Sequence, residues 1–106
     1  KYAEQMLKPR TAYWAGICDL EYRAVRIRDL KSKWGSCSAR RNISLNWQLI
    51  FLDEDLIDYV IVHELMHLHE LNHSPRYWAW VAKFYPEYKA ARKRMKEFEW
   101  LIGILK

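Results

Sequence analysis

One predicted helix, from Asp53 to about Leu71, constrains the fold of this chain most strongly. Apolar side chains surround its middle, which is typical of a helix buried at the centre of a domain. Asp53 is a suitable N-cap, and the acidic residues after it complement the helix dipole. The same segment carries His63, Glu64 and His67, and polar groups in such surroundings are costly to bury without partners. A fold with this helix at its centre must therefore supply those partners.

The spacing of these residues predicts a metal site. Side chains four apart on a helix project from the same face, so His63 and His67 can bind one metal ion. Glu64 is then placed to act as a general base on metal-bound water. His73, which follows in the sequence, would add a third ligand and leave a fourth position open. That arrangement is typical of catalytic rather than structural zinc sites.

The third ligand has alternatives. A turn at Asn72 would swing His73 back toward the other two histidines, and its spacing from His67 equals that in the pattern H-E-x-x-H-x-x-G-x-x-H. Glu70 stands where that pattern has glycine, so we expect the helix to continue to Asn72. Glu70 is itself an alternative carboxylate ligand, whereas His69 lies on a different helix face. We expect Zn²⁺, for which Ni, Co or Mn could substitute.

The rest of the chain predicts an α+β domain with a small antiparallel sheet. Helices are predicted over residues 2–16, 53–71, 75–85 and 87–102, and strands over 22–29 and 43–47. Pro9 either breaks the first helix or starts its second half, and Gly16 is a plausible end. The two strands are expected to pair as an antiparallel hairpin with a wide loop. Ser74 and Pro75 are suited to the N-cap and first position of the third helix.

Length and composition fit a single domain over residues 1–106. Hydrophobic residues make up 51% of the chain, which argues against disorder. The two cysteines, Cys18 and Cys37, cannot form a disulfide framework, and no targeting or membrane-spanning run is visible. We therefore expect a cytoplasmic protein with no membrane partner. Because the chain begins with Lys1 and is helical from its first residues, we expect it to be the C-terminal part of a longer protein.

Several motifs occur in a fixed order along the chain. They are W-G-S-C-S at 34–38, I-S-L-N-W at 43–47, I-D-Y-V-I-V-H-E-L-M-H-L at 57–68 and N-H-S-P-x-Y-W at 72–78. Together they resemble the YgjP-like metal-dependent hydrolases, which are related to the SprT and WLM zinc metallopeptidases. The resemblance covers roughly residues 20–95. It implies a zincin-like minimal domain, in which an active-site helix packs on a small sheet beside a cleft.

The resemblance also implies the roles of individual residues. His63, His67 and His73 would hold one zinc ion per chain, and Glu64 would be catalytic. Full-length members of the family usually carry a further β-rich N-terminal region, which is not evident in this chain. Their natural substrates are poorly defined.

Two segments near the metal motif have both a functional and a structural interpretation. Trp34, Gly35 and Ser36 would lie on a strand edge beside the cleft, where an extended peptide can pair with the backbone. Alternatively, Trp34 packs in the core, Gly35 forms a bulge and Cys37 is buried. Tyr77 would either donate its hydroxyl to an oxyanion in the site or pack in the core.

The sequence thus predicts zinc-dependent hydrolysis of a peptide or amide bond in a peptide or protein substrate. Glu64 would take a proton from the metal-activated water and return it to the leaving amine. The net charge of +5 supports an alternative, a nucleic-acid-associated module that processes DNA-linked proteins as SprT-like relatives do. A solvated basic surface would explain the charge equally well. An inactive metal-binding scaffold is a third option, against which the intact Glu64 argues.

Overall fold

The structure is a computed structural model that describes residues 2–104. It confirms the α+β class predicted from the sequence. The elements, in chain order, are α1 (Tyr2–Cys18), β1 (Ala24–Arg28), β2 (Gly35–Cys37), β3 (Asn42–Asn46), the 3-10 helix η1 (Trp47–Phe51), α2 (Glu54–Met66), α3 (Pro75–Phe84), α4 (Tyr88–Lys96) and α5 (Glu99–Ile104).

The sheet is mixed, in the order β1-β3-β2. β1 and β3 are parallel, with Val25 opposite Ile43, and β2 is antiparallel to β3, with Ser36 opposite Ser44. The expected antiparallel hairpin of the two longer strands is therefore wrong. The segment predicted to be a wide loop contains the short strand β2, so the chain reverses twice and returns in its original direction. A strand of this length is too short to show an alternating pattern.

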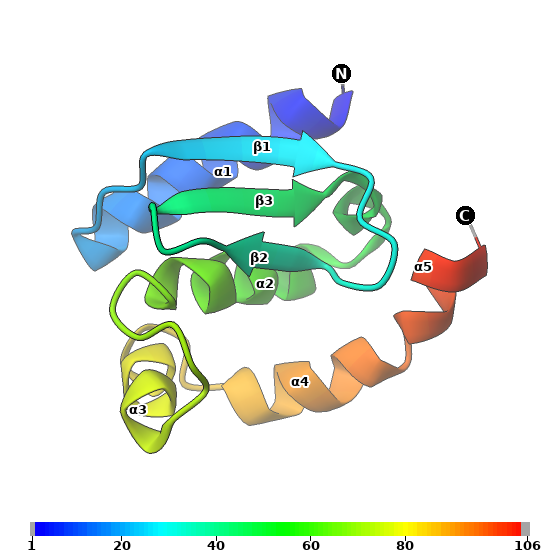
Figure 1. Ribbon diagram of the computed structural model, residues 1–106. Helices are drawn as coiled ribbons and strands as arrows, with labels where there is room; N and C mark the ends of the chain where they lie inside the picture. Colours follow the sequence, from blue (N-terminus) through cyan, green and yellow to red (C-terminus); the bar gives the residue numbers. More distant parts are fainter. Residues whose placement is uncertain (1, 105–106) are drawn as a thin grey trace.

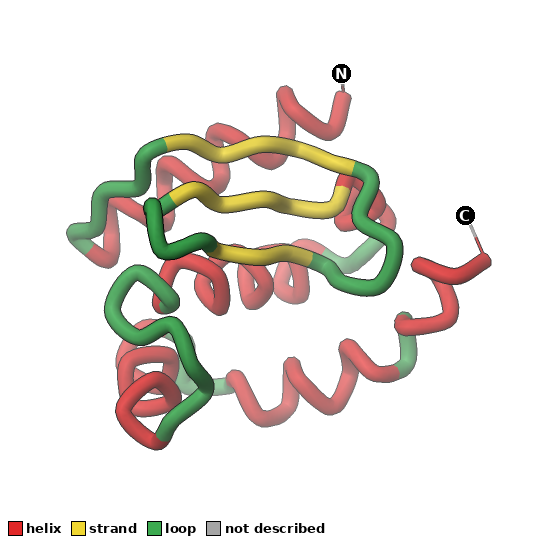
Figure 2. Tube along the Cα trace, viewed as in Figure 1, coloured by secondary structure: helices red, strands yellow, loops and turns green. Residues whose placement is uncertain are grey.

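Helix α2 lies at the centre, as its apolar middle predicts. α1 and α2 cover one face of the sheet, and α3 and α4 pack against the other side of α2 (Figures 1 and 2). Leu56, Ile57, Ile61 and Leu65 of α2 are almost completely buried. Because packing from both sides holds this helix, it provides a rigid support for the polar residues near its end.

Helix α1 runs through Pro9 and past Gly16 to Cys18, so neither residue ends it. Its contacts with α2, β1 and η1 stabilise the helix despite the proline. The helix ends at Asp19, whose φ of 56° lies in the left-handed region. The Leu20 N–H then donates to the Ala15 carbonyl over 2.9 Å, which closes the Schellman type of helix end.

Helix α2 ends at Met66, earlier than the predicted end near Leu71. The amides of Leu68 and His69 donate to carbonyls three residues back, at 2.9 Å each, so the chain tightens into a turn. Among the described residues only Asp19 and Arg41 are non-glycine residues with positive φ, so a left-handed conformation at Asn72 does not form the predicted turn.

In the C-terminal part of the chain, the start of α3 is as predicted, but the last predicted helix is not continuous. Ser74 caps α3 by accepting from the Tyr77 N–H, and Pro75 opens the helix. The single last helix predicted over 87–102 is instead divided into α4 and α5. No helix within residues 2–104 combines the length and the apolar character needed to cross a bilayer.

Candidate metal centre and active-site cleft

Three histidines converge at the end of α2. His63 and His67 come from the helix and the residue that caps it, and the loop before α3 brings in His73. One ligand nitrogen from each of the three lies within 4.8 Å of the others. The Nε2 atoms of His63 and His73 are 3.3 Å apart. Two nitrogens bound to one tetrahedral Zn²⁺ stand roughly 3.3–3.4 Å apart, so this pair fits a shared metal ion.

The surroundings of His67 fix which of its nitrogens is free. Its Nδ1 lies 2.9 Å from the Glu70 backbone carbonyl, which can only accept a hydrogen bond. Nδ1 therefore carries the proton, and Nε2 keeps its lone pair for a metal. The early end of α2 is what turns this carbonyl toward the ring. The Nδ1 atom of His63 is similarly close to a neighbour, the Tyr59 hydroxyl, at 3.4 Å.

Tyr77 packs against the histidines from α3 and is fully buried. Its hydroxyl donates to the His63 carbonyl over 2.6 Å, and its ring stacks on His67 at 4.4 Å between centroids. Burial raises the pKa of this hydroxyl. Because its proton is directed to the backbone of α2, Tyr77 in this arrangement supports His63 and His67 and does not point its donor toward an oxyanion.

Electrostatics favour neutral, metal-binding imidazoles. Burial lowers the pKa of His63 to about 3, and the nearby His67, His73 and Arg92 act in the same direction. Burial also lowers the pKa of His67. The neutral ring is the form that binds a metal ion, and the lowered pKa keeps His63 and His67 in this form at neutral pH.

Glu64 points toward the sheet side of the same site and is only 5% exposed. Burial raises the pKa of its carboxyl to about 8, while Lys33 acts in the opposite direction. A bound divalent cation would also favour the ionised form. Gly35 of β2 lies so close that a Cβ atom there would stand 2.9 Å from the Glu64 Cγ atom. The absence of a side chain at Gly35 therefore makes room for Glu64.

Asn46 is a supporting residue that sequence reasoning missed. It is fully buried at the end of β3, and its side-chain amide donates to the Leu30 and Lys33 carbonyls over 2.9 and 3.0 Å. Its backbone N–H donates to the Trp34 carbonyl over 2.9 Å. Asn46 thus holds the loop that leads into β2, and with it the position of Gly35. An Asn ending a strand of buried aliphatic residues is the only signal the sequence offers for it.

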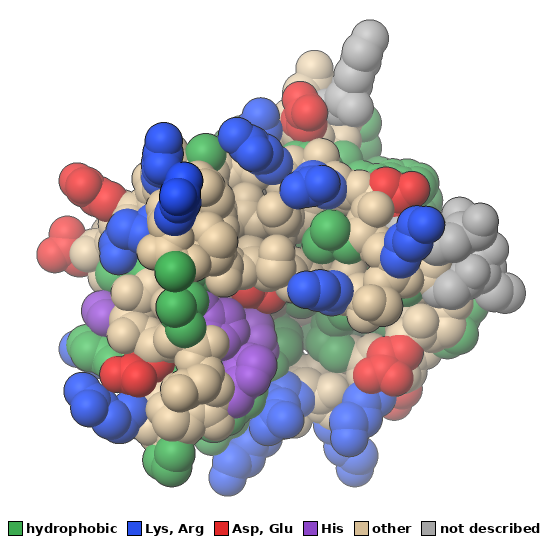
Figure 3. Space-filling view, in the orientation of Figure 1, with side chains coloured by type: hydrophobic (Ala, Val, Ile, Leu, Met, Phe, Trp, Pro, Cys, Tyr) green, Lys and Arg blue, Asp and Glu red, His purple; other side chains and the backbone are tan. Residues whose placement is uncertain are grey.

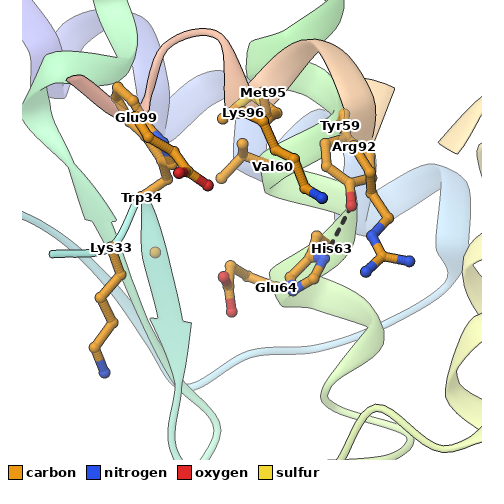
Figure 4. A pocket seen from close by; sticks show the side chains of 11 residues that line it. Lys33, Trp34, Tyr59, Val60, His63, Glu64, Arg92, Met95, Lys96 and Glu99 are labelled. Carbon is orange, nitrogen blue, oxygen red and sulfur yellow. Dashed lines mark hydrogen bonds between the residues drawn. The ribbon is translucent and has the colours of Figure 1, made fainter. Parts of the chain in front are cut away.

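A cleft of ≈ 350 Å³ adjoins His63 and Glu64. Its walls come from β2 with the residues before it, from α2 and from α4, as Figure 4 shows. It is lined by Lys33, Trp34, Gly35, Tyr59, Val60, His63, Glu64, Arg92, Met95, Lys96 and Glu99. The space-filling view shows the histidines at the edge of a hollow between the sheet and the C-terminal helices (Figure 3).

The remaining predicted site residues lie around this centre. Trp34 and Gly35 line the cleft, and Ser36 follows them in β2. Cys37 is half-buried rather than buried, and burial raises its pKa to about 11, so it is a poor nucleophile at neutral pH. Sequence reasoning also missed Arg92, whose guanidinium lies over the Trp78 ring at 4.4 Å.

His69 and Glu70, the other two residues considered as third ligand, have other partners. The His69 ring stacks on Trp80, with centroids 3.7 Å apart and planes at 3°. The Glu70 carboxylate pairs with Arg76 over 3.5 Å. Neither belongs to the group of residues whose ligand atoms converge, so the geometry favours His73 as the third ligand.

Convergent imidazoles beside a buried carboxylate and an open cleft define the class of metal-dependent hydrolases. The family model YgjP-like, metallopeptidase domain matches residues 1–98. The chain therefore belongs to the YgjP-like metallopeptidase family, as the ordered motifs of its sequence indicate.

Two solved structures share the fold. The crystal structure of the metallopeptidase zymogen of Pyrococcus abyssi abylysin is 29% identical with a TM-score of 0.74, covering 85% of this chain and 91% of that one. The crystal structure of the metallopeptidase zymogen of Methanocaldococcus jannaschii jannalysin is 22% identical with a TM-score of 0.72, covering 90% and 96%. The second likeness concerns the fold alone. No curated protein matches this chain.

Proposed function

We propose that this chain is a zinc-dependent peptidase in which His63, His67 and His73 hold the metal and Glu64 is the general base. The observation that carries the proposal is the convergence of the three imidazoles within 4.8 Å, next to a buried carboxylate. Three imidazoles with an open position suit Zn²⁺. When bound, the metal would polarise the scissile carbonyl and acidify a water molecule.

The residues of the chain would perform the proton transfers. Glu64 would accept a proton from the attacking water and pass it to the nitrogen of the leaving amine. Burial raises the pKa of the Glu64 carboxyl, whereas a bound cation would favour the ionised form that accepts the proton. The near contact with Gly35 holds the carboxylate against β2.

The substrate would be an extended stretch of peptide or protein. β2 pairs with β3 on one side only, which makes it an edge strand of the described sheet. Its residues continue directly from Trp34 at the cleft, so a peptide could pair with the backbone of β2 while its side chains enter the cleft. This arrangement would bring the peptide backbone past Glu64.

The Glu64→Gln variant tests the proposal. We expect it to keep its zinc, because no ligand is changed, and to lose turnover of a casein or peptide-library substrate by about 10²–10⁴-fold. Glu70→Gln is the matched control, since Glu70 follows His67 but pairs with Arg76 outside the site. Zinc content by elemental analysis and cleavage by mass spectrometry are measured on the same samples. Turnover that survives in Glu64→Gln would contradict the assigned role.

A further inference from the structure

The cleft beside the metal centre has an uneven distribution of charge. Its rim carries three cationic side chains, Lys33, Arg92 and Lys96, against the carboxylates of Glu64 and Glu99. Two of these cations, Arg92 and Lys96, stand one helical turn apart on α4 and therefore project from the same face. Figure 4 shows them along the wall nearest His63, with Glu99 toward the other end beside Trp34. The His63 end of the cleft is thus its positive end.

Arg92 is held in place without using its hydrogen-bonding edge. The guanidinium lies over the face of Trp78 at 4.4 Å, and Trp78 in turn stacks on Tyr88 and His73, at 5.2 and 5.7 Å between centroids. Stacking fixes the plane of the guanidinium while its N–H groups remain available. The same aromatic column links Arg92 to a proposed metal ligand, so its position is coupled to the site.

The charged ends of these side chains have no acidic partner among the residues that the structure describes. Among residues whose side chains the structure describes, no Asp or Glu lies within ion-pair distance of Lys33, Arg92 or Lys96. Arg94, on the same helix, shows the contrast, since it pairs with Asp53 and Asp55 over 2.6 Å each. The cations that face the cleft are thus free to bind an anion, whereas Arg94 is engaged in holding α4 to α2.

We propose that Arg92 and Lys96 bind a carboxylate of the peptide substrate, so that the cleft selects peptides with an acidic residue close to the scissile bond. This proposal rests on the proposed peptidase function and names its substrate class. A planar guanidinium can bind a carboxylate through two parallel N–H donors, and the neighbouring ammonium adds a third contact.

The other walls of the cleft favour an acidic side chain on an apolar stem. Val60 and Met95 supply aliphatic surface between the charged ends, and Trp34 supplies an aromatic face. The methylene groups of a glutamate could cover this surface while its carboxylate reaches α4. The same cations would also accept the terminal carboxylate of a peptide, so these two sources must be separated by experiment.

Binding to zinc-loaded Glu64→Gln protein tests the inference without turnover. Three peptides of about nine residues, identical and Ala/Ser-rich except as stated, are titrated while tryptophan fluorescence is recorded. The first has one central Glu and blocked ends, the second has Gln in its place, and the third is the Gln peptide with a free C-terminal carboxylate. We expect the Glu peptide to bind about five- to tenfold more tightly than the blocked Gln peptide.

The variants Arg92→Gln and Lys96→Gln, in the same background, should each reduce this preference. Lys93→Gln is the matched control, because Lys93 is exposed on α4, is not among the residues lining the cleft, and loses the same charge. A preference that survives in Lys93→Gln and falls in the other two supports the inference. If only the peptide with the free C-terminus binds more tightly than the blocked Gln peptide, Arg92 and Lys96 bind a terminal carboxylate. The substrates would then be peptides cleaved near their C-terminus.

Two results would overturn the inference. Equal binding of all three peptides would remove the specificity for a carboxylate and leave the peptidase function intact, provided that wild-type protein cleaves them. An equal loss of preference in Lys93→Gln would show a general effect of net charge. Failure of the proposed function is distinguishable from both, because wild-type protein would then cleave no peptide while Glu64→Gln could still bind the Glu peptide.

Discussion

The two sides of the candidate site are built in opposite ways. On the histidine side, formed by the end of α2 and the start of α3, Tyr77 is fully buried and its hydroxyl is hydrogen-bonded to the backbone of His63. On the cleft side, where α4 forms one wall, Arg92 and Lys96 are exposed and have no described acidic partner. The first arrangement fixes geometry, and the second leaves charge available to a ligand.

Under the proposed function, the histidine side would perform the chemical step and the cleft side would select the substrate. Metal ligands and a general base must be held within a fraction of an ångström, which requires packed rings and satisfied hydrogen bonds. Recognition of a substrate side chain instead needs groups that exchange water for the ligand. Substitutions on the histidine side should therefore change metal binding and the chemical step, whereas those on α4 should change the choice of substrate.

The largest effect short of removing Glu64 or a proposed ligand is expected at Gly35, which lines the cleft beside Glu64. A Cβ atom in Gly35→Ala would stand 2.9 Å from the Glu64 Cγ atom and 3.1 Å from the Ser44 carbonyl, so the Glu64 side chain must shift. We expect turnover to fall about 10²-fold, since small displacements of a catalytic group are costly, with zinc retained. Gly16→Ala is the control, because a Cβ atom there meets nothing within 4 Å. Full activity of Gly35→Ala would show that the contact does not position Glu64.

The next largest effect is a loss of stability, expected when Asn46, which holds the loop leading into β2, is replaced. Asn46→Ala removes two donors from buried surroundings and leaves the Leu30 and Lys33 carbonyls without them. We expect the free energy of unfolding, measured with urea, to fall by about 2–3 kcal/mol. Asn42→Ala, at the half-buried start of the same strand, should cost about 1 kcal/mol or less. Equal losses in the two variants would refute the special role of Asn46.

A smaller effect, on zinc affinity, is expected when the hydroxyl of Tyr77 is removed from the histidine side. Tyr77→Phe removes the hydrogen bond to the His63 carbonyl but keeps the ring that stacks on His67. We expect zinc affinity, measured by competition with a chelator, to weaken about tenfold, as for other groups that orient ligands. Tyr85→Phe makes the equivalent change at the far end of α2, where the hydroxyl donates to Asp55, and should leave zinc affinity unchanged. Indistinguishable affinities for the two variants would contradict the positioning role of Tyr77.

The smallest effect is expected far from both sides. Arg10 of α1 makes two hydrogen bonds to the Asp58 carboxylate, at 2.8 and 3.1 Å, and both side chains are partly exposed. Arg10→Gln should lower the free energy of unfolding by about 1 kcal/mol and leave zinc affinity and turnover unchanged. A loss of zinc affinity in this variant would mean that α1 affects the site through α2. It would contradict the view that only the histidine side controls zinc binding.

Local patterns in the sequence predicted the parts of the site that depend on a single helix. The four-residue spacing of His63 and His67 and the apolar surroundings of α2 both follow from helical periodicity. The sequence predicted that His73 lies close to His63 and His67, but it placed the turn that brings it there at the wrong residue. The structure ends α2 at Met66 and turns the chain there, whereas the expectation placed that turn at Asn72.

Contacts between distant segments were not predictable in this way. The parallel pairing of β1 with β3 depends on the short strand β2, which has no periodic signal of its own. The near contact of Gly35 with Glu64 joins two segments that no local rule relates. Arg92 belonged to a run of basic residues that is indistinguishable in sequence from a solvated face, and only the fold places it in the cleft.

The measurement that tests the central claim most directly is zinc affinity and stoichiometry for wild type, His73→Ala and His69→Ala. His69 lies in the same turn but stacks on Trp80 outside the triad, so it controls for the loss of an imidazole. We predict about one zinc per chain in wild type and His69→Ala. His73→Ala should bind zinc at least about 10²-fold more weakly, because it removes one of the three proposed protein ligands. Wild-type affinity in His73→Ala, or the same loss in both variants, would contradict the three-histidine site.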